Sequence, residues 1–114
     1  MPDLVSLEEL KREIRVTDTA DDVVLSRKLT EAQALVLDYV GQRHGDTAEE
    51  WTDTVAAWDE GTAPVQVVAA ILELAAALAR FRGDDEVVPD WYTAGLLPGG
   101  VRMKLDRLRD PALA

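Results

Sequence analysis

Few side chains of this sequence could act as a nucleophile, a general base or a metal ligand. The chain of 114 residues contains one histidine and no cysteine, and its serines are Ser6 and Ser26. Ser6 has the spacing of a helix cap, and His44 stands beside Gly45 in an expected turn, where an exposed and inert histidine is the usual finding. Phosphate-loop, H-E-x-x-H and EF-hand patterns are absent from the sequence. We therefore expect no catalytic residue and no cofactor, and an enzyme is the least favoured class.

Two acidic runs are the candidates for cation binding. Glu49-Glu50 and Asp84-Asp85-Glu86 carry adjacent carboxylates, which divalent cations accept as ligands. Adjacent carboxylates at a helix start or in a turn are more often a solvated surface. The absence of cysteine also removes disulfides and Cys-ligated zinc. We therefore expect no metal site.

Composition and charge restrict the class of protein. Hydrophobic residues make up 47 % of the chain, but only three Trp, two Tyr and one Phe are aromatic, so the core is expected to consist of Val, Leu and Ala. One domain spanning residues 1–114 fits this length. The 22 Asp and Glu against 12 Lys and Arg leave a net charge of −10, which repels phosphate backbones and disfavours a DNA-reading module.

The sequence shows neither a signal peptide nor a membrane span. Its first residues lack the basic and then apolar regions of a signal peptide. The longest apolar stretch, residues 67–79, is interrupted by Glu73 and is shorter than the ~20 residues that a span needs. We expect the chain to remain in the cytoplasm in which it is made, with no membrane partner.

Helical spacing of apolar residues accounts for the first part of the chain. Ser6 and Glu9 have the capping-box spacing that starts a first short helix. A second helix is expected over residues 21–40, and Gly41 is expected to end it in a left-handed conformation. Its apolar seam consists of Leu25, Leu29, Ala32, Val36 and Tyr39.

An acidic segment follows the second helix. Between residues 44 and 63 there are six acidic residues and no Lys or Arg. Thr47 and Glu50 repeat the capping-box spacing. Three apolar residues then fall at i, i+4 and i+7 and predict a short helix whose Trp-rich face packs in the core rather than around a ligand. These residues are Trp51, Val55 and Trp58.

The helix expected over residues 64–82 is apolar on nearly every side. Its few polar residues, Gln66, Glu73 and Arg80, are seven apart and form one narrow stripe. We expect this long helix at the centre of an all-α bundle of about four to five helices. Its apolar surface exceeds what so small a chain covers, which favours a second subunit against it. The stripe is either a candidate subunit interface or the solvent-facing edge of a buried helix.

The C-terminal part of the chain is basic in an otherwise acidic protein. Residues 84–100 are expected to be an ordered irregular segment pinned by its aromatic residues, and a last helix is expected from Pro98 onwards. Between residues 98 and 110, four cations stand against two carboxylates. The cations are Arg102, Lys104, Arg107 and Arg109. Without interleaved aromatic residues they favour an acidic protein partner over nucleic acid; alternatively, the helix is simply amphipathic.

Several segments carry a resemblance to a known family. They are residues 5–11 with Ile14-Arg15, Asp21-Asp22 leading to Leu25, residues 38–41, and the end of the chain from Leu97-Pro98 through Val101 and Leu105 to residues 108–114. Their order and spacing resemble the phage head-tail connector proteins of the gp6-like family, which complete the head or adapt it to the tail.

The resemblance implies a small helical protein that assembles as a ring, dodecameric in the virion, beneath the portal of a capsid. The ring would extend the DNA channel and join the capsid to the neck or tail. The partners would be further copies of the chain, the portal protein and the next neck or tail protein, while DNA passes without specific binding. The protein would be made in the host cytoplasm and reside in the virion neck. The basic C-terminal segment would then reach an acidic portal surface.

A small acidic helical regulator that binds and inhibits another protein is the alternative. It explains the negative charge equally well. It does not account for the narrow polar face of the helix over residues 64–82, and it would be a monomer or a two-fold dimer.

Overall fold

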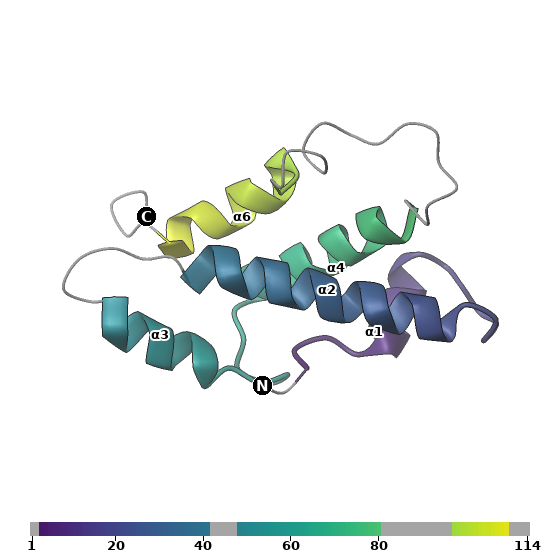
Figure 1. Cartoon of the computed structure of the whole chain (residues 1–114), viewed down its shortest axis with the longest axis horizontal. Coiled ribbons are helices and arrows are strands. Elements are labelled where there is room, and N and C mark those ends of the chain that lie inside the picture. Colours follow the sequence, from purple (N-terminus) through teal and green to yellow (C-terminus); the bar gives the residue numbers. More distant parts are fainter. Residues whose placement is uncertain (1–2, 42–47, 81–96, 110–114) are drawn as a thin grey trace.

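The computed structural model describes residues 3–41, 48–80 and 97–109 (Figure 1). Within these ranges the chain forms five α-helices and no strand, which confirms the all-α class. The helices are α1 (Leu7–Glu13), α2 (Asp22–Gly41), α3 (Ala48–Ala56), α4 (Val65–Arg80) and α6 (Gly99–Arg109). None of these helices is long and apolar enough to cross a bilayer. His44, the acidic run at residues 84–86 and the expected irregular segment up to residue 96 lie outside the described residues.

The cap at Ser6 starts α1 as predicted. The Ser6 hydroxyl oxygen accepts a hydrogen bond from the Glu9 backbone N–H at 3.2 Å. The same hydroxyl donates a hydrogen bond to the Glu9 carboxylate at 3.3 Å. The carboxylate therefore binds the Ser6 side chain, whereas in a capping box it would bind the Ser6 backbone N–H. One orphan donor of the first turn is therefore satisfied, as at other N-caps.

The end of α2 differs from the sequence prediction. Gly41 is the last helical residue and is not in the left-handed region. The last carbonyl groups of a helix have no hydrogen-bond partner within the helix. One of them, the carbonyl of Val40, accepts a hydrogen bond from the Trp51 Nε1–H at 2.7 Å. A side chain from α3 thus provides the partner that a glycine cap was expected to supply.

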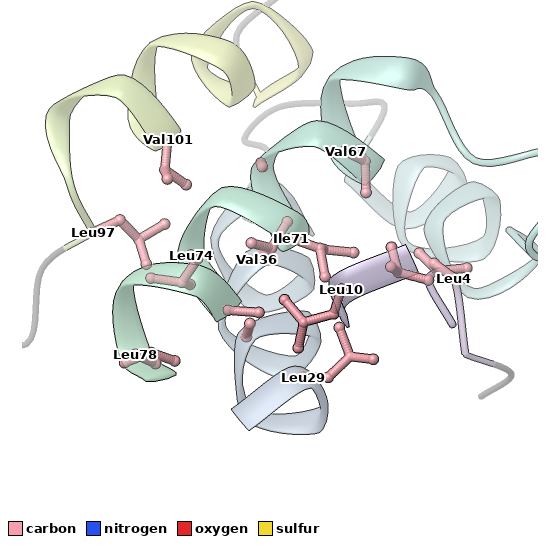
Figure 2. Packing of buried hydrophobic residues seen from close by; sticks show 14 of the residues in the cluster. Leu4, Leu10, Leu29, Val36, Val67, Ile71, Leu74, Leu78, Leu97 and Val101 are labelled. Carbon is pink, nitrogen blue, oxygen red and sulfur yellow. The ribbon is translucent and has the colours of Figure 1, made fainter. Parts of the chain in front are cut away.

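One hydrophobic core joins the helices (Figure 2). α2 and α4 form its centre, while α1 and α6 each pack on both of these helices and α3 packs on α2. Trp58 is the one aromatic side chain buried in the described part of the chain, so the core is aliphatic as predicted. Buried residues labelled in Figure 2 are Leu4, Leu10, Leu29, Val36, Val67, Ile71, Leu74, Leu78, Leu97 and Val101.

The apolar helix α4 is mostly covered within the chain. It has 16 residues and is shorter than α2, which has 20. α1, α2 and α6 all pack against α4, and among its described side chains only Val65, in the first turn, is a large apolar residue with most of its surface exposed (81 %). Neighbouring helices of the same chain therefore cover most of the surface that was expected to need a second subunit.

Two polar contacts hold the N-terminal segment on the bundle. The buried Gln33 side-chain oxygen on α2 accepts a hydrogen bond from the Leu4 backbone N–H at 2.7 Å. Lys11 on α1 binds Asp22 in the first turn of α2 at 2.8 Å. These contacts place α1 beside both α2 and α4, so the first helix closes one side of the core.

Candidate functional site

The basic helix α6 presents one face to the core and another to solvent. Val101 and Leu105 are fully buried, four residues apart, as helical spacing requires. Arg102 and Met103 are exposed, and Met103 keeps 78 % of its surface accessible. Arg102 forms no ion pair with any residue that the structure describes. The exposed face of α6 therefore combines a free cation with an unusually exposed apolar side chain.

The two candidate sets of residues meet at one ion pair. Lys104, one of the four cations of the C-terminal helix, donates a hydrogen bond to the carboxylate of Glu73 in the polar stripe. This contact joins α6 to α4. Gln66 is exposed in the first turn of α4. The side chains of the remaining members, Arg80, Arg107 and Arg109, are outside the described part. Glu73 and Lys104 are thus already paired within the chain, whereas Gln66 and Arg102 face solvent.

Two further contacts set the position of α6. A Cβ atom added to Gly100 would lie 2.9 Å from the Glu73 carboxylate, so the absence of a side chain there leaves room for the Glu73–Lys104 pair. The Tyr39 hydroxyl on α2 donates to Asp106 at 2.5 Å. Tyr39 was predicted as a core residue of the α2 seam, but it is half-buried and its polar end is used to hold α6. α6 is therefore attached by polar contacts to both central helices.

The short helix α3 carries an acidic outer surface; from the sequence its Glu49-Glu50 pair was considered only as a cation site, and no protein-binding surface was identified there. Glu49, Glu50 and Asp53 are exposed and form no ion pair with described residues. Two small apolar residues, Ala56 and Ala57, are exposed beside them. The signal in the sequence was the acidic segment of residues 44–63, which could have been recognised as a surface once its apolar positions were assigned to the core.

The opposite face of α3 is anchored by Trp51 and Val55, as predicted, whereas Trp58, expected on the same helix, lies two residues beyond its end at Ala56. Val55 and Trp58 are buried in the core. The Trp51 and Trp58 rings meet edge to face with their centroids 5.6 Å apart, a favourable arrangement for an aromatic pair. Together with the bond from Trp51 to the end of α2, these contacts hold the acidic surface outward.

A tight turn follows α3. The Asp59 carboxylate accepts hydrogen bonds from the Gly61 N–H at 2.8 Å, the Thr62 N–H at 3.0 Å and the Thr62 hydroxyl at 3.1 Å. The bond from Gly61 contributes most to holding the pKa of this carboxyl below its ordinary 3.8, followed by the bond from the Thr62 hydroxyl. No group of three or more potential metal ligands occurs among the residues that the structure describes. The described residues therefore present two separate charged surfaces, an acidic one on α3 and a basic one on α6.

Comparison with known proteins identifies a family for most of the chain. A family model described as phage gp6-like head-tail connector protein matches residues 4–89. The matched range contains α1, α2, α3 and α4 and ends before α6, so the basic helix and the end of the chain lie beyond it. No curated protein and no solved structure matches the chain.

Proposed function

This chain belongs to the phage gp6-like head-tail connector family, and on that premise we propose that it assembles as a ring under the portal of a phage capsid. Members of this family are structural proteins of the junction between head and tail. The proposed ring extends the DNA exit channel and joins the capsid to the neck or tail. It contains twelve copies, and its subunits are made in the host cytoplasm before they enter the virion.

The family match over residues 4–89 is the observation that carries this proposal, since it includes more than half of the chain. The charge of the protein is consistent with it. A net charge of −10 suits the wall of a channel through which DNA moves, because phosphates that meet like charge gain nothing from releasing their counterions.

Helix α6 is the proposed contact with an acidic protein surface at the junction, on the portal or on another partner. The sequence of α6 holds four cations and one carboxylate, a net charge of +3 in a strongly acidic chain. The proposed contact residues are Arg102, Lys104, Arg107 and Arg109. Arg102 is exposed and free for such a contact, while Lys104 is engaged with Glu73 and contributes to the orientation of the helix.

The polar stripe of α4 is the proposed subunit interface. Gln66 is the exposed member at the start of the helix, and Arg80 stands at its last position. Glu73, between them, is expected to serve the interface by holding Lys104 and thus the angle of α6. A neighbouring subunit would then meet α4 and α6 as one surface.

The proposal is tested first by the mass of the purified protein and then by its binding to heads. Light scattering after size exclusion, over a wide range of concentration, is expected to find a large closed oligomer, either in the free protein or after portal-bearing heads that lack their connector are added. Electron microscopy of those heads is expected to show added density below the portal. A protein that stays a two-fold dimer and leaves the heads unchanged would contradict the proposal and favour an acidic regulator.

A further inference from the structure

We infer that α6 of one copy of this chain docks on α3 of the next copy, so that the acidic partner of α6 is the protein itself. The inference rests on the proposed ring and identifies the surface through which α6 acts. In a head-to-tail ring every subunit uses two different surfaces, and each surface meets the other one on a neighbour. The chain has two such surfaces of opposite charge, on α3 and on α6.

The two surfaces cannot satisfy each other within one subunit. α3 and α6 do not pack together, and α2 packs on both of them. In Figure 1 α6 lies above α2 and α3 lies below it, so that α2 stands between them. The side chains in question, Arg102 on α6 and Asp53 on α3, are both exposed. Each helix therefore offers its charge to another molecule.

The surfaces also match in their apolar content. Met103, beside Arg102, is among the most exposed large apolar side chains of the described residues. Ala56, the last residue of α3, and Ala57, which follows it, are exposed one helical turn after Asp53. A methionine is unbranched and adapts to irregular apolar surface, so Met103 can lie on the two alanines while Arg102 reaches Asp53. Apolar contact at the centre with opposite charges beside it is the usual anatomy of a protein interface.

Charge reversal with mixing tests the pairing. Arg102→Glu places a carboxylate of α6 opposite Asp53 of the next copy, and Asp53→Lys places a cation of α3 opposite Arg102, so either variant alone puts like charges together at this contact. Each variant alone is expected to need at least about tenfold more protein than the wild type to form the oligomer, because like charges across an interface are costly. An equimolar mixture is expected to assemble near the wild-type concentration, since the reversed α6 of one variant meets the reversed α3 of the other.

Two control variants make the same charge changes elsewhere. Arg27→Glu on α2 and Glu13→Lys on α1 alter exposed side chains that form no ion pair with described residues. They are expected to assemble like the wild type, and circular dichroism is expected to show the same helix content in all four variants. Equal loss of assembly in variants and controls, or no rescue on mixing, would overturn the docking of α6 on α3.

Crosslinking tests the same contact by position. The natural chain has no cysteine, so Ala57→Cys and Met103→Cys introduce the only thiols. When the two single variants are mixed in the state in which the wild type assembles, free or on portal-bearing heads, a short bismaleimide is expected to join them to each other. A chain carrying both substitutions is expected to give a ladder of multimers, because a head-to-tail contact links every copy to two neighbours. A product that stops at the dimer, or no product, would overturn the inference.

These outcomes separate the inference from the proposed function. If Arg102→Glu prevents binding to heads while the subunits still assemble and no α3–α6 crosslink forms, α6 meets the portal; the inference then fails and the connector function stands. If the wild type neither assembles nor binds heads, the proposed function fails and the inference fails with it.

Discussion

Lys104 on α6 forms an ion pair with Glu73 on α4, although 31 residues separate them in the sequence. Both side chains keep about two-fifths of their surface exposed, so solvent screens the pair. Exposed pairs of this kind are worth little, about 0–1 kcal/mol. The importance of the pair is therefore geometric: it links the polar stripe of one helix to the basic surface of another.

Reversing one charge of this pair is expected to lower stability slightly and reversing both is expected to restore it. Glu73→Lys and Lys104→Glu each place like charges together and are expected to lower the free energy of unfolding by about 1 kcal/mol. The double variant restores the attraction. Urea unfolding of the four proteins gives the coupling energy.

The same variants distinguish a direct from an indirect role of Glu73. If Glu73 only positions α6, the double variant is expected to recover oligomer formation together with stability. If stability recovers while assembly does not, Glu73 itself touches the neighbouring subunit.

Two adjacent glycines at the start of α6 are expected to respond differently to alanine. Gly99 has open space where a Cβ would lie, so Gly99→Ala is expected to raise stability by up to about 1 kcal/mol through helix propensity. In Gly100→Ala the new methyl group must displace the Glu73 carboxylate, 2.9 Å away, and the gain is expected to be smaller. Thermal unfolding compares them. In a Glu73→Ala background the two substitutions are expected to give equal gains, and a persistent difference would rule out this explanation.

Arg15 is expected to be replaceable by glycine with a gain in stability. It has a φ of 59°, the left-handed region in which a side chain is strained. Its N–H bonds to the Arg12 carbonyl and the Val16 N–H bonds to the Lys11 carbonyl, the pattern of a helix C-cap that normally ends on glycine. Arg15→Gly is therefore expected to raise the free energy of unfolding by about 1 kcal/mol.

The matched control for Arg15 is the arginine inside α1. Arg12→Gly removes the same side chain from a helical position and is expected to lower stability by roughly 0.5–1 kcal/mol. Urea unfolding measures both variants. A loss of stability in Arg15→Gly as well would show that the arginine side chain, rather than the backbone, determines the effect.

The turn at Asp59 is expected to weaken in acid. The pKa of this carboxyl is lower in the folded chain than its ordinary 3.8, chiefly because the Gly61 N–H bonds to the charged form. The ionised group therefore contributes stability above its unfolded pKa, and this contribution is lost as the pH falls through the lower folded pKa. Asp59→Asn keeps an acceptor oxygen but no charge. The free energy of unfolding of both proteins is measured between neutral pH and about pH 3, and the difference between the two values is expected to shrink in acid. A difference that does not change with pH would contradict the assignment of this stability to the ionised Asp59.

Local patterns in the sequence determined most of the secondary structure. The cap at Ser6, the buried positions of α2 from Leu25 to Val36 and the core-facing positions of Trp51 and Val55 on α3 are all where their spacing predicts. Each of these features depends on residues within one or two helical turns. Backbone geometry therefore relates them directly to the sequence, without knowledge of the rest of the fold.

Tertiary structure alone decided which of the polar residues meet. The sequence placed Glu73 and Lys104 in two separate candidate sets, and only the packing of α6 on α4 brings them together. Gln33 became a buried acceptor because the N-terminal segment crosses α2 at that point and needs a partner for the Leu4 N–H. The separation of acidic α3 from basic α6 likewise follows from the position of α2 between them. Such relationships depend on the angles at which the helices cross. These angles are determined by the side-chain volumes of the whole core, and the spacing of residues within one helix does not predict them.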